Sequence, residues 1–343
     1  MPNDPRRRLV ALLKHPHLGA GLRIALGLIV GLAFTAVLLD NIDFGHVGEI
    51  LAAASLWPIV FALIAYAADF LLRAIRFWLM LREVSHHPIP LAPSISPFIA
   101  SFGISDVLPL RAGDGFRVIW FNRQFGTPIG TLIGAMLVER ILDLVSILIL
   151  GGIALSLASG HAPPILVANF QLILMVAILA GLGVLFAPAL LVRILERVKL
   201  PFAAGPIEAL TAALRTTAET VERMGSWRQL LLLTCLSLAC WILECMVFIG
   251  AWLSLNGDPA AFEKPFLSFA FATLGTLVPS LPGHFGSFEY FGVEAFTLAG
   301  VEASFAAAVV LLAHLILWAP TAIYGILWLL IGAQGKRAPA PRP

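Results

Sequence analysis

The sequence is short of charge. Of its 343 residues, only 12% are Asp, Glu, Lys or Arg, about half the ~25% that soluble domains carry. The hydrophobic fraction is 59% and the mean hydropathy is +0.94. This composition is typical of a polytopic membrane protein, and the length leaves no room for a sizeable soluble domain beside the spans.

Cysteines and the motifs of common enzymes are also scarce. Cys235, Cys240 and Cys245 lie five residues apart, which turns each about 140° from the last on a helix, so they share no face. We interpret them as small hydrophobic residues rather than metal ligands or disulfides. The sequence has no P-loop, His-Glu-x-x-His, Gly-x-Ser-x-Gly or Cys-x-x-Cys. It therefore predicts no metal, no cofactor and no nucleotide-driven pump, and nothing in it predicts a nucleic-acid partner.

Two apolar segments are interrupted by Pro and Gly in a similar way. Residues 101–117 and 273–289 each contain Leu-Pro with a Gly four residues after the Pro. In an apolar chain, backbone opened in this way can line a site. The alternative is a pair of interfacial turns that share turn residues. For the first interpretation, the predicted hinges are Pro109, Gly113, Pro282, Gly283 and Gly286.

The apolar runs predict six full spans. They cover residues 24–39, 56–80, 129–157, 165–191, 230–253 and 304–331. The basic residues before the first run would also suit a signal peptide, but no small-residue cleavage site follows, which favours a retained span. Between Pro97 and Pro109 a helix would extend about 18 Å, too short for ~30 Å of hydrocarbon, so this segment is predicted to be re-entrant. If 266–281 and 286–300 each crossed fully, there would be eight spans.

Lys and Arg gather in alternate loops. The basic segments are 1–23, 73–123, 192–228 and 336–342, and the segments poor in Arg are 40–55, 158–164 and 254–263. The positive-inside rule then predicts that both termini are cytoplasmic. The first broken segment would open from the cytoplasm and the second from the outside, so that residues 56–158 and 229–332 form an inverted repeat.

The expected fold is therefore an all-α polytopic membrane protein of six to eight transmembrane helices, with two broken or re-entrant segments in an inverted repeat. A basic cytoplasmic segment, 1–23, would precede a single transmembrane domain, 24–332, and a basic, Pro-rich cytoplasmic tail, 333–343, would follow it. Within the cytoplasmic loop 192–228, apolar residues recur at helical spacing. This pattern suits an amphipathic helix on the membrane surface or a plain solvated loop helix.

Several charges fall inside the predicted spans, where each costs about 2.5–3.5 kcal/mol at the bilayer centre. Asp69, Arg73 and Arg76 share one helix face and are predicted charge partners. Glu139, Arg140 and Asp143 lie in the middle of one span, where Arg140 can reach Asp143. Such a cluster is either an internal salt bridge between helices or part of a polar site.

Further polar residues lie in the spans and broken segments. Glu244 and Glu289 join the group of intramembrane acids, and His284 lies within the second broken segment. His314 is interpreted as a hydrogen-bonded packing residue. Arg117 is expected nearer the interface than Arg140.

Three motifs resemble one family. Residues 106–117 (DVLPLRAGDGFR) are similar to its Asn-x-x-Leu-Pro-x-Arg-x-Gly-Glu-x-x-Arg motif, and 138–143 (VERILD) to its Glu-Arg-x-x-Asp signature. Residues 282–289 (PGHFGSFE) resemble its Pro-Gly-x-x-Gly-x-x-Glu segment. This is the flippase-like membrane domain of lysylphosphatidylglycerol synthases, which also occurs as stand-alone proteins, and the resemblance covers about residues 20–332. Asp106 and Asp114 stand where the family more often has Asn and Glu.

The resemblance implies a multi-pass protein of the bacterial plasma membrane, with a membrane lipid as substrate and no synthase activity. The residues expected to bind the lipid headgroup are Arg111, Asp114, Arg117, Glu139, Arg140, Asp143, His284 and Glu289. We expect a lipid translocase rather than an enzyme. The alternatives are an accessory protein that holds a lipid-synthesis enzyme at the membrane, and an intramembrane enzyme that uses the acid cluster. No nucleophile–base pair supports the last.

Overall fold

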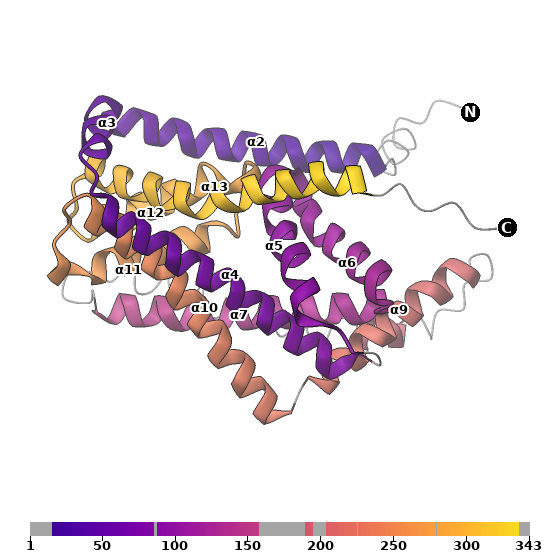
Figure 1. Cartoon of the computed structure of the whole chain (residues 1–343). Helices are drawn as coiled ribbons and strands as arrows, with labels where there is room; N and C mark the ends of the chain where they lie inside the picture. Colours follow the sequence, from indigo (N-terminus) through magenta and orange to yellow (C-terminus); the bar gives the residue numbers. More distant parts are fainter. Residues whose placement is uncertain are drawn as a thin grey trace, which may run out of the picture.

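The computed structural model describes residues 16–85, 88–157, 189–194, 204–224, 226–278 and 280–335. These residues form α-helices and short 3₁₀ turns, with no strand among them (Figure 1). Three of the described helices are long and apolar enough to cross a membrane: α4 (Leu56–Val84), α10 (Trp227–Ser254) and α13 (Ala303–Gly335). The prediction of an all-α polytopic membrane protein is confirmed.

The elements of residues 16–157 follow in a simple order. They are α2 (Pro16–Asn41), α3 (Phe44–Ala52), α4, α5 (Leu91–Val107), the 3₁₀ turn η1 (Pro109–Arg111), α6 (Ala112–Phe125) and α7 (Ile129–Leu157). The later elements are α9 (Ala204–Arg223), α10, η2 (Pro259–Ala261), α11 (Glu263–Gly275), η3 (Pro282–His284), α12 (Ser287–Leu298) and α13. In the first part of the chain, α4 is followed by the short helices α5 and α6, joined at a 3₁₀ turn, and then by the long helix α7. In the second part, α10 is followed in the same way by α11 and α12, joined at a 3₁₀ turn, and then by α13.

The two corresponding long helices α4 and α10 pack against each other in opposite directions (Figure 1). The amide of Ser55, at the start of α4, donates to the carbonyl of Ser254, at the end of α10 (2.7 Å). Further along, Gly250 lies against Pro58 and Ala62, where an added Cβ would come within 2.8 Å. Small residues therefore bring these two backbones together.

The pairs α5–α6 and α11–α12 are helical hairpins whose turns meet inside the bundle. Their four helices have 12 to 17 residues, which is about 18–26 Å of helix and less than the ~30 Å of a bilayer core. The α5–α6 hairpin starts and ends toward the end of the bundle that carries α9, and α11–α12 lies toward the end that carries α3 (Figure 1). Entry of the two hairpins into a membrane from opposite faces, and hence the inverted repeat, stays a prediction.

The N-terminal end of α2 and the C-terminal end of α13 lie at the same end of the bundle (Figure 1). This arrangement agrees with termini on one side of a membrane, and their cytoplasmic placement stays a prediction. α2 runs beside α12 and the second broken segment, where Gly27 and Gly31 touch the backbone of Ser280 and Leu281.

α5 and α13 cross at two glycines. A Cβ on Gly103 would lie 1.8 Å from the carbonyl oxygen of Thr321, and one on Gly325 would lie 2.6 Å from the carbonyl carbon of Gly103. Contacts this close exclude any side chain at the crossing. The two glycines therefore allow the short helix α5 to pack closely against the long helix α13.

The structure reproduces most predicted boundaries and corrects two. The span 129–157 coincides with α7, and those at 56–80, 230–253 and 304–331 lie within α4, α10 and α13. However, α5 begins at Leu91 and continues through Pro97, so the short helix predicted after Pro97 is six residues too short. The acidic loop 40–55 contains α3, which is capped by the Asp43 side chain.

The helix predicted in the loop 192–228 is present as α9, and its place on a membrane surface or in solvent stays a prediction. It packs on the start of α7, where the Thr217 hydroxyl donates to the Gly130 carbonyl (3.0 Å) and Thr220 fills the space beside Gly134. The predicted span 165–191 lies almost entirely outside the described residues, as do most of 1–23 and all of 336–343.

Candidate functional site

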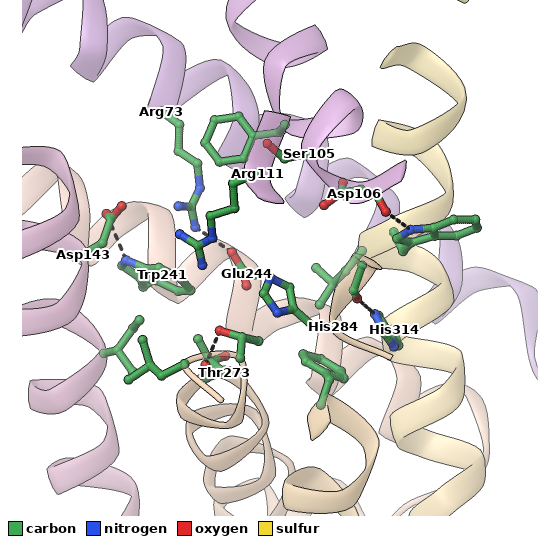
Figure 2. A pocket seen from close by; sticks show the side chains of 18 of the residues that line it. Arg73, Ser105, Asp106, Arg111, Asp143, Trp241, Glu244, Thr273, His284 and His314 are labelled. Carbon is green, nitrogen blue, oxygen red and sulfur yellow. Dashed lines mark hydrogen bonds and ion pairs between the residues drawn. The ribbon is translucent and has the colours of Figure 1, made fainter. Parts of the chain in front are cut away.

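A cavity of about 260 Å³ lies where the two hairpin turns meet (Figure 2). Its wall is partly aromatic and partly charged, which is unusual inside a bundle of apolar helices. The acidic, basic and histidine side chains that line it are Arg73, Asp106, Arg111, Asp114, Arg140, Asp143, Glu244, His284 and His314. They come from both parts of the chain, from α4 to α7 and from α10 to α13.

The two broken segments share an unusual backbone as well as a sequence pattern. After Leu108-Pro109, Leu110 and Arg111 have φ values of 62° and 51°, and after Leu281-Pro282, Gly283 and His284 have φ values of 72° and 64°. A left-handed residue other than Gly costs about 1–2 kcal/mol, so such pairs persist only where the surroundings enforce them. Each Leu-Pro is therefore followed by the same left-handed turn.

That turn places Arg111 and His284 at equivalent positions, and both side chains line the cavity. Figure 2 shows Arg111 reaching toward its centre, between Trp241 on one side and His284 on the other. Among the described residues, Arg111 has no hydrogen bond or ion pair within bonding distance. Its five donors are free to bind a phosphate or carboxylate that enters the cavity.

Arg73 and Glu244 connect α4 with α10 beside the cavity. An Nη of Arg73 lies 2.6 Å from Glu244 Oε2, and its Nε lies 2.7 Å from Asp69 Oδ1. The guanidinium also stacks on Trp241, 4.4 Å from the ring centroid. Asp69 is fully buried behind Arg73, so it balances that charge without reaching the cavity.

Arg76 does not join Asp69 and Arg73 as expected, but pairs with α7. Its Nη1 lies 2.6 Å from Asp143 Oδ1, and its Nη2 lies 3.6 Å from Glu139 Oε1. Trp241 donates to the same Asp143 oxygen (3.2 Å). Asp143 faces the cavity, whereas Arg76 is buried behind it.

Arg140 was expected to pair with Asp143 and instead pairs with Asp114 on α6. The two lie 3.0 Å apart, with side chains 39% and 28% exposed, and both line the cavity. Because Asp143 is held by Arg76 and Glu139 by Arg117, removing Arg140 would not leave those two acids without a cation. The expectation that Arg140 alone neutralises them is wrong.

Arg117 was expected nearer the membrane interface than Arg140, which stays a prediction, but its side chain is buried between helices. Its Nη1 lies 3.1 Å from Glu139 Oε2, each side chain is 1% exposed, and its Nε donates to Ser101 (2.9 Å). Three phenylalanine rings surround the guanidinium at 4.4–5.1 Å, which satisfies its flat faces. Neither Arg117 nor Glu139 lines the cavity; they join α5, α6 and α7.

Glu289 also lies outside the cavity wall. One of its oxygens accepts the Gly286 amide (2.7 Å) and caps α12, and the other contacts His314 (2.5 Å). His314 is hydrogen-bonded, as expected of a packing residue, yet it also lines the cavity.

The predicted hinge glycines are positions of close contact. An added Cβ on Gly113 would lie 1.7 Å from the Ser101 carbonyl oxygen, and one on Gly286 would lie 2.4 Å from that of Gly31. Gly286 and Gly283 also have positive φ, but Gly113 does not. Pro109 and Pro282 each begin a 3₁₀ turn, where the missing N–H removes no internal bond.

Several lining residues were not among the predicted binding residues. Glu244 and Asp106 are acids of the wall, and Asp106 accepts a hydrogen bond from Thr321 (2.8 Å). Ser105 and Thr273 are also lining residues, and their hydroxyl oxygens are buried with no hydrogen-bond partner among the described residues. A charge in a span marked Glu244, but no sequence pattern marks a hydroxyl as unpartnered.

Comparison with protein families finds a match over most of the chain. Residues 24–325 match the family described as "Lysylphosphatidylglycerol synthase TM region". A search of curated proteins returns no match.

Proposed function

We propose that this chain, which belongs to the lysylphosphatidylglycerol synthase transmembrane family, functions as a lipid translocase. The family consists of multi-pass membrane proteins involved in lipid-related processes. The cavity receives the polar headgroup of a membrane lipid while the acyl chains stay in the bilayer. The proposal includes no chemical reaction on the lipid. It places the protein in the bacterial plasma membrane, with both termini in the cytoplasm.

The observation that carries this proposal is the pair of equivalent turns that bring Arg111 and His284 into one cavity. Substrate sites of alternating-access transporters lie between structural repeats and are built from interrupted helices. The antiparallel contact of α4 and α10 is the arrangement that an inverted repeat would give to its two corresponding helices. These features support a site that is exposed in turn to either face.

The polar groups of the wall suit an amphiphile with an acidic headgroup. Arg111 supplies a guanidinium without a bonded partner, and the Ser105 and Thr273 hydroxyls supply two unpartnered groups. The other lining arginines, Arg73 and Arg140, are already paired with acids. Arg111 is therefore the group we assign to the headgroup phosphate.

The test uses purified protein in vesicles that contain a fluorescent anionic glycerophospholipid. Dithionite reduces the label in the outer leaflet only, so the protected fraction reports movement between leaflets. We expect wild-type protein to make nearly all of the label reducible without ATP, and Arg111→Gln to slow exchange at least tenfold. Arg123→Gln, at an exposed position of α6, is the matched control and should exchange at the wild-type rate.

Two results would count against the proposal. If Arg111→Gln and Arg123→Gln exchanged lipid equally fast, the cavity would not be the headgroup path. If wild-type protein moved no lipid under any ion gradient, the accessory role beside a lipid-synthesis enzyme would become the better account.

A further inference from the structure

His314 connects three parts of the second broken segment. From α13, its Nδ1 lies 2.5 Å from Glu289 Oε1 on α12, and its Nε2 lies 2.9 Å from the Gly283 carbonyl oxygen in η3. The second Glu289 oxygen accepts the Gly286 amide (2.7 Å). The imidazole lies between the rings of Phe285 and Phe288, at 4.5 and 4.4 Å. The His314 imidazole thus connects the turn η3, the carboxylate that caps α12 and the long helix α13.

The hydrogen bonds of this imidazole determine its proton content. The Gly283 carbonyl only accepts, so Nε2 must carry a hydrogen. One further proton must lie between Nδ1 and Glu289 Oε1, because otherwise a nitrogen lone pair would face a carboxylate oxygen. The described geometry therefore requires either an imidazolium with a carboxylate or a neutral imidazole with a carboxylic acid. Both forms contain the same exchangeable proton.

Removal of that proton makes the arrangement untenable. A neutral imidazole has one N–H, so it can donate to Glu289 or to Gly283 but not to both. The remaining contact would bring two acceptors together in a buried site, where His314 and Glu289 are each 5% exposed and an unmet bond costs its full desolvation penalty. The contact that is lost joins α13 either to the turn, at Gly283, or to the capping carboxylate of α12, at Glu289.

The turn that would be released is the one with left-handed backbone at Gly283, His284 and Gly286. Strained backbone of this kind stays in place only while its contacts hold it. Because Gly283, His284 and His314 all line the cavity, the proton can leave to water there. A change at the turn would alter the wall of the same cavity.

Other titratable groups face this region from each neighbouring element. They are Tyr66 on α4, Asp106 on α5, Arg111 in η1, Glu244 on α10 and His284 in η3. Among the described residues, none of these bonds directly to His314 or Glu289. They set the field around the pair, while the pair itself holds the proton.

We propose that His314 and Glu289 form a proton-binding site whose occupancy fastens the second broken segment to α13 and α12. While the proton is bound, the turn is closed as described; when it leaves, the turn opens. The site itself stands without lipid transport. Its further role, in which the proton is the ion coupled to movement of the headgroup, rests on the proposed function.

Hydrogen–deuterium exchange of the peptide that covers residues 281–288 tests the site without any lipid substrate. The protein is held in nanodiscs of zwitterionic lipid and measured from pH 5 to pH 9, with rates corrected for intrinsic exchange. Protection of the Gly286 amide is expected at low pH. We expect it to fall at least tenfold as pH rises, with the slope of a single proton.

Glu289→Gln separates a proton site from a merely structural contact. The amide nitrogen of Gln can donate to Nδ1 of a neutral His314, and its oxygen can accept the Gly286 amide. All three hydrogen bonds then form without the exchangeable proton, so protection should stay high at every pH. His314→Ala should leave the turn unprotected throughout. Glu294→Gln, the same change at an exposed position of α12, should keep the wild-type transition.

Two results would overturn the proton site, and a third would separate it from lipid transport. A wild-type protection that does not change between pH 5 and pH 9, or a Glu289→Gln variant that keeps the wild-type transition, overturns the proton site. A transition that Glu289→Gln abolishes, in a protein that moves no lipid in the dithionite assay, supports the proton site and contradicts the transport proposal. If lipid does move, a pH gradient should drive its exchange in wild type but not in Glu289→Gln.

Discussion

Arg117 and Glu139 form an ion pair that solvent does not reach, with Nη1 and Oε2 3.1 Å apart and each side chain 1% exposed. The pair joins α6 to α7, and Ser101 extends it to α5. Its position away from the cavity makes it part of the framework that holds the first broken segment. Framework charges and cavity charges should therefore respond differently to mutation.

Arg117→Ala should destabilise the protein by about 3–5 kcal/mol, because it leaves Glu139 buried with only the longer contact to Arg76 Nη2, at 3.6 Å. The same change at Arg123, an exposed arginine of α6, should have an effect within about 0.5 kcal/mol. Thermal unfolding of the two purified variants in one detergent measures the difference. Equal melting temperatures would show that the Arg117 pair does not support the fold.

Arg140→Ala should have little effect on stability. Its pair with Asp114 is partly exposed, at 39% and 28%, and such pairs contribute about 0–1 kcal/mol. Lipid exchange should nevertheless slow, because both residues line the cavity. The swapped double variant Arg140→Asp with Asp114→Arg should recover part of the exchange rate. A large loss of expression for Arg140→Ala would contradict this assignment.

Gly103→Ala should disrupt the crossing of α5 and α13, because its Cβ would lie 1.8 Å from the Thr321 carbonyl oxygen. Overpacking of this kind costs about 1–3 kcal/mol or more. Gly115→Ala is the matched control, since it lies in α6 and nothing is within 4 Å of its Cβ. Melting temperatures should fall for Gly103→Ala and stay level or rise for Gly115→Ala.

Gly113→Val and Gly286→Val should both impair folding. The sequence pattern alone suggested inserted, stable proteins that fail only in transport. The contacts of 1.7 Å at Gly113 and 2.4 Å at Gly286 are with backbone carbonyl oxygens, which cannot turn aside as a side chain can. The yield of monodisperse protein after extraction measures the effect, with Gly115→Val as the comparison. Wild-type yields for both variants would support flexible hinges.

Glu302 gives a pH dependence outside the spans. The amides of Ser304 and Phe305 donate to its carboxylate (2.8 and 2.7 Å), which lowers the pKa of Glu302 below its usual range. The contribution of this carboxylate to folding stability is therefore fully present above the ordinary glutamate pKa. It is lost as the pH falls through the lowered pKa. The melting-temperature difference between wild type and Glu302→Gln should be small at pH 6, since the group is exposed, and should vanish toward pH 3. A difference that grows on acidification would contradict this.

The sequence by itself determined the class of protein, most spans and the two broken segments. A 29-residue apolar run such as α7 must be a helix, because no other element satisfies its backbone in an apolar surrounding. Leu-Pro followed by Gly identified both turns, since Pro removes a donor and fixes φ. Arg111 and His284 each follow the Pro of their motif by two residues, so the shared spacing already implied that they correspond. The backbone angles show this correspondence directly.

The tertiary structure decided which charge faces which. Arg111 and Arg117 belong to one motif, six residues apart, yet one reaches into the cavity and the other lies among three phenylalanine rings. Helical periodicity places a side chain on a face of its own helix, but the neighbour on that face comes from packing. For the same reason Arg76 pairs with Asp143, the acid expected for Arg140, and Arg140 pairs with Asp114. A histidine interpreted as packing, His314, joins Glu289 to the Gly283 turn.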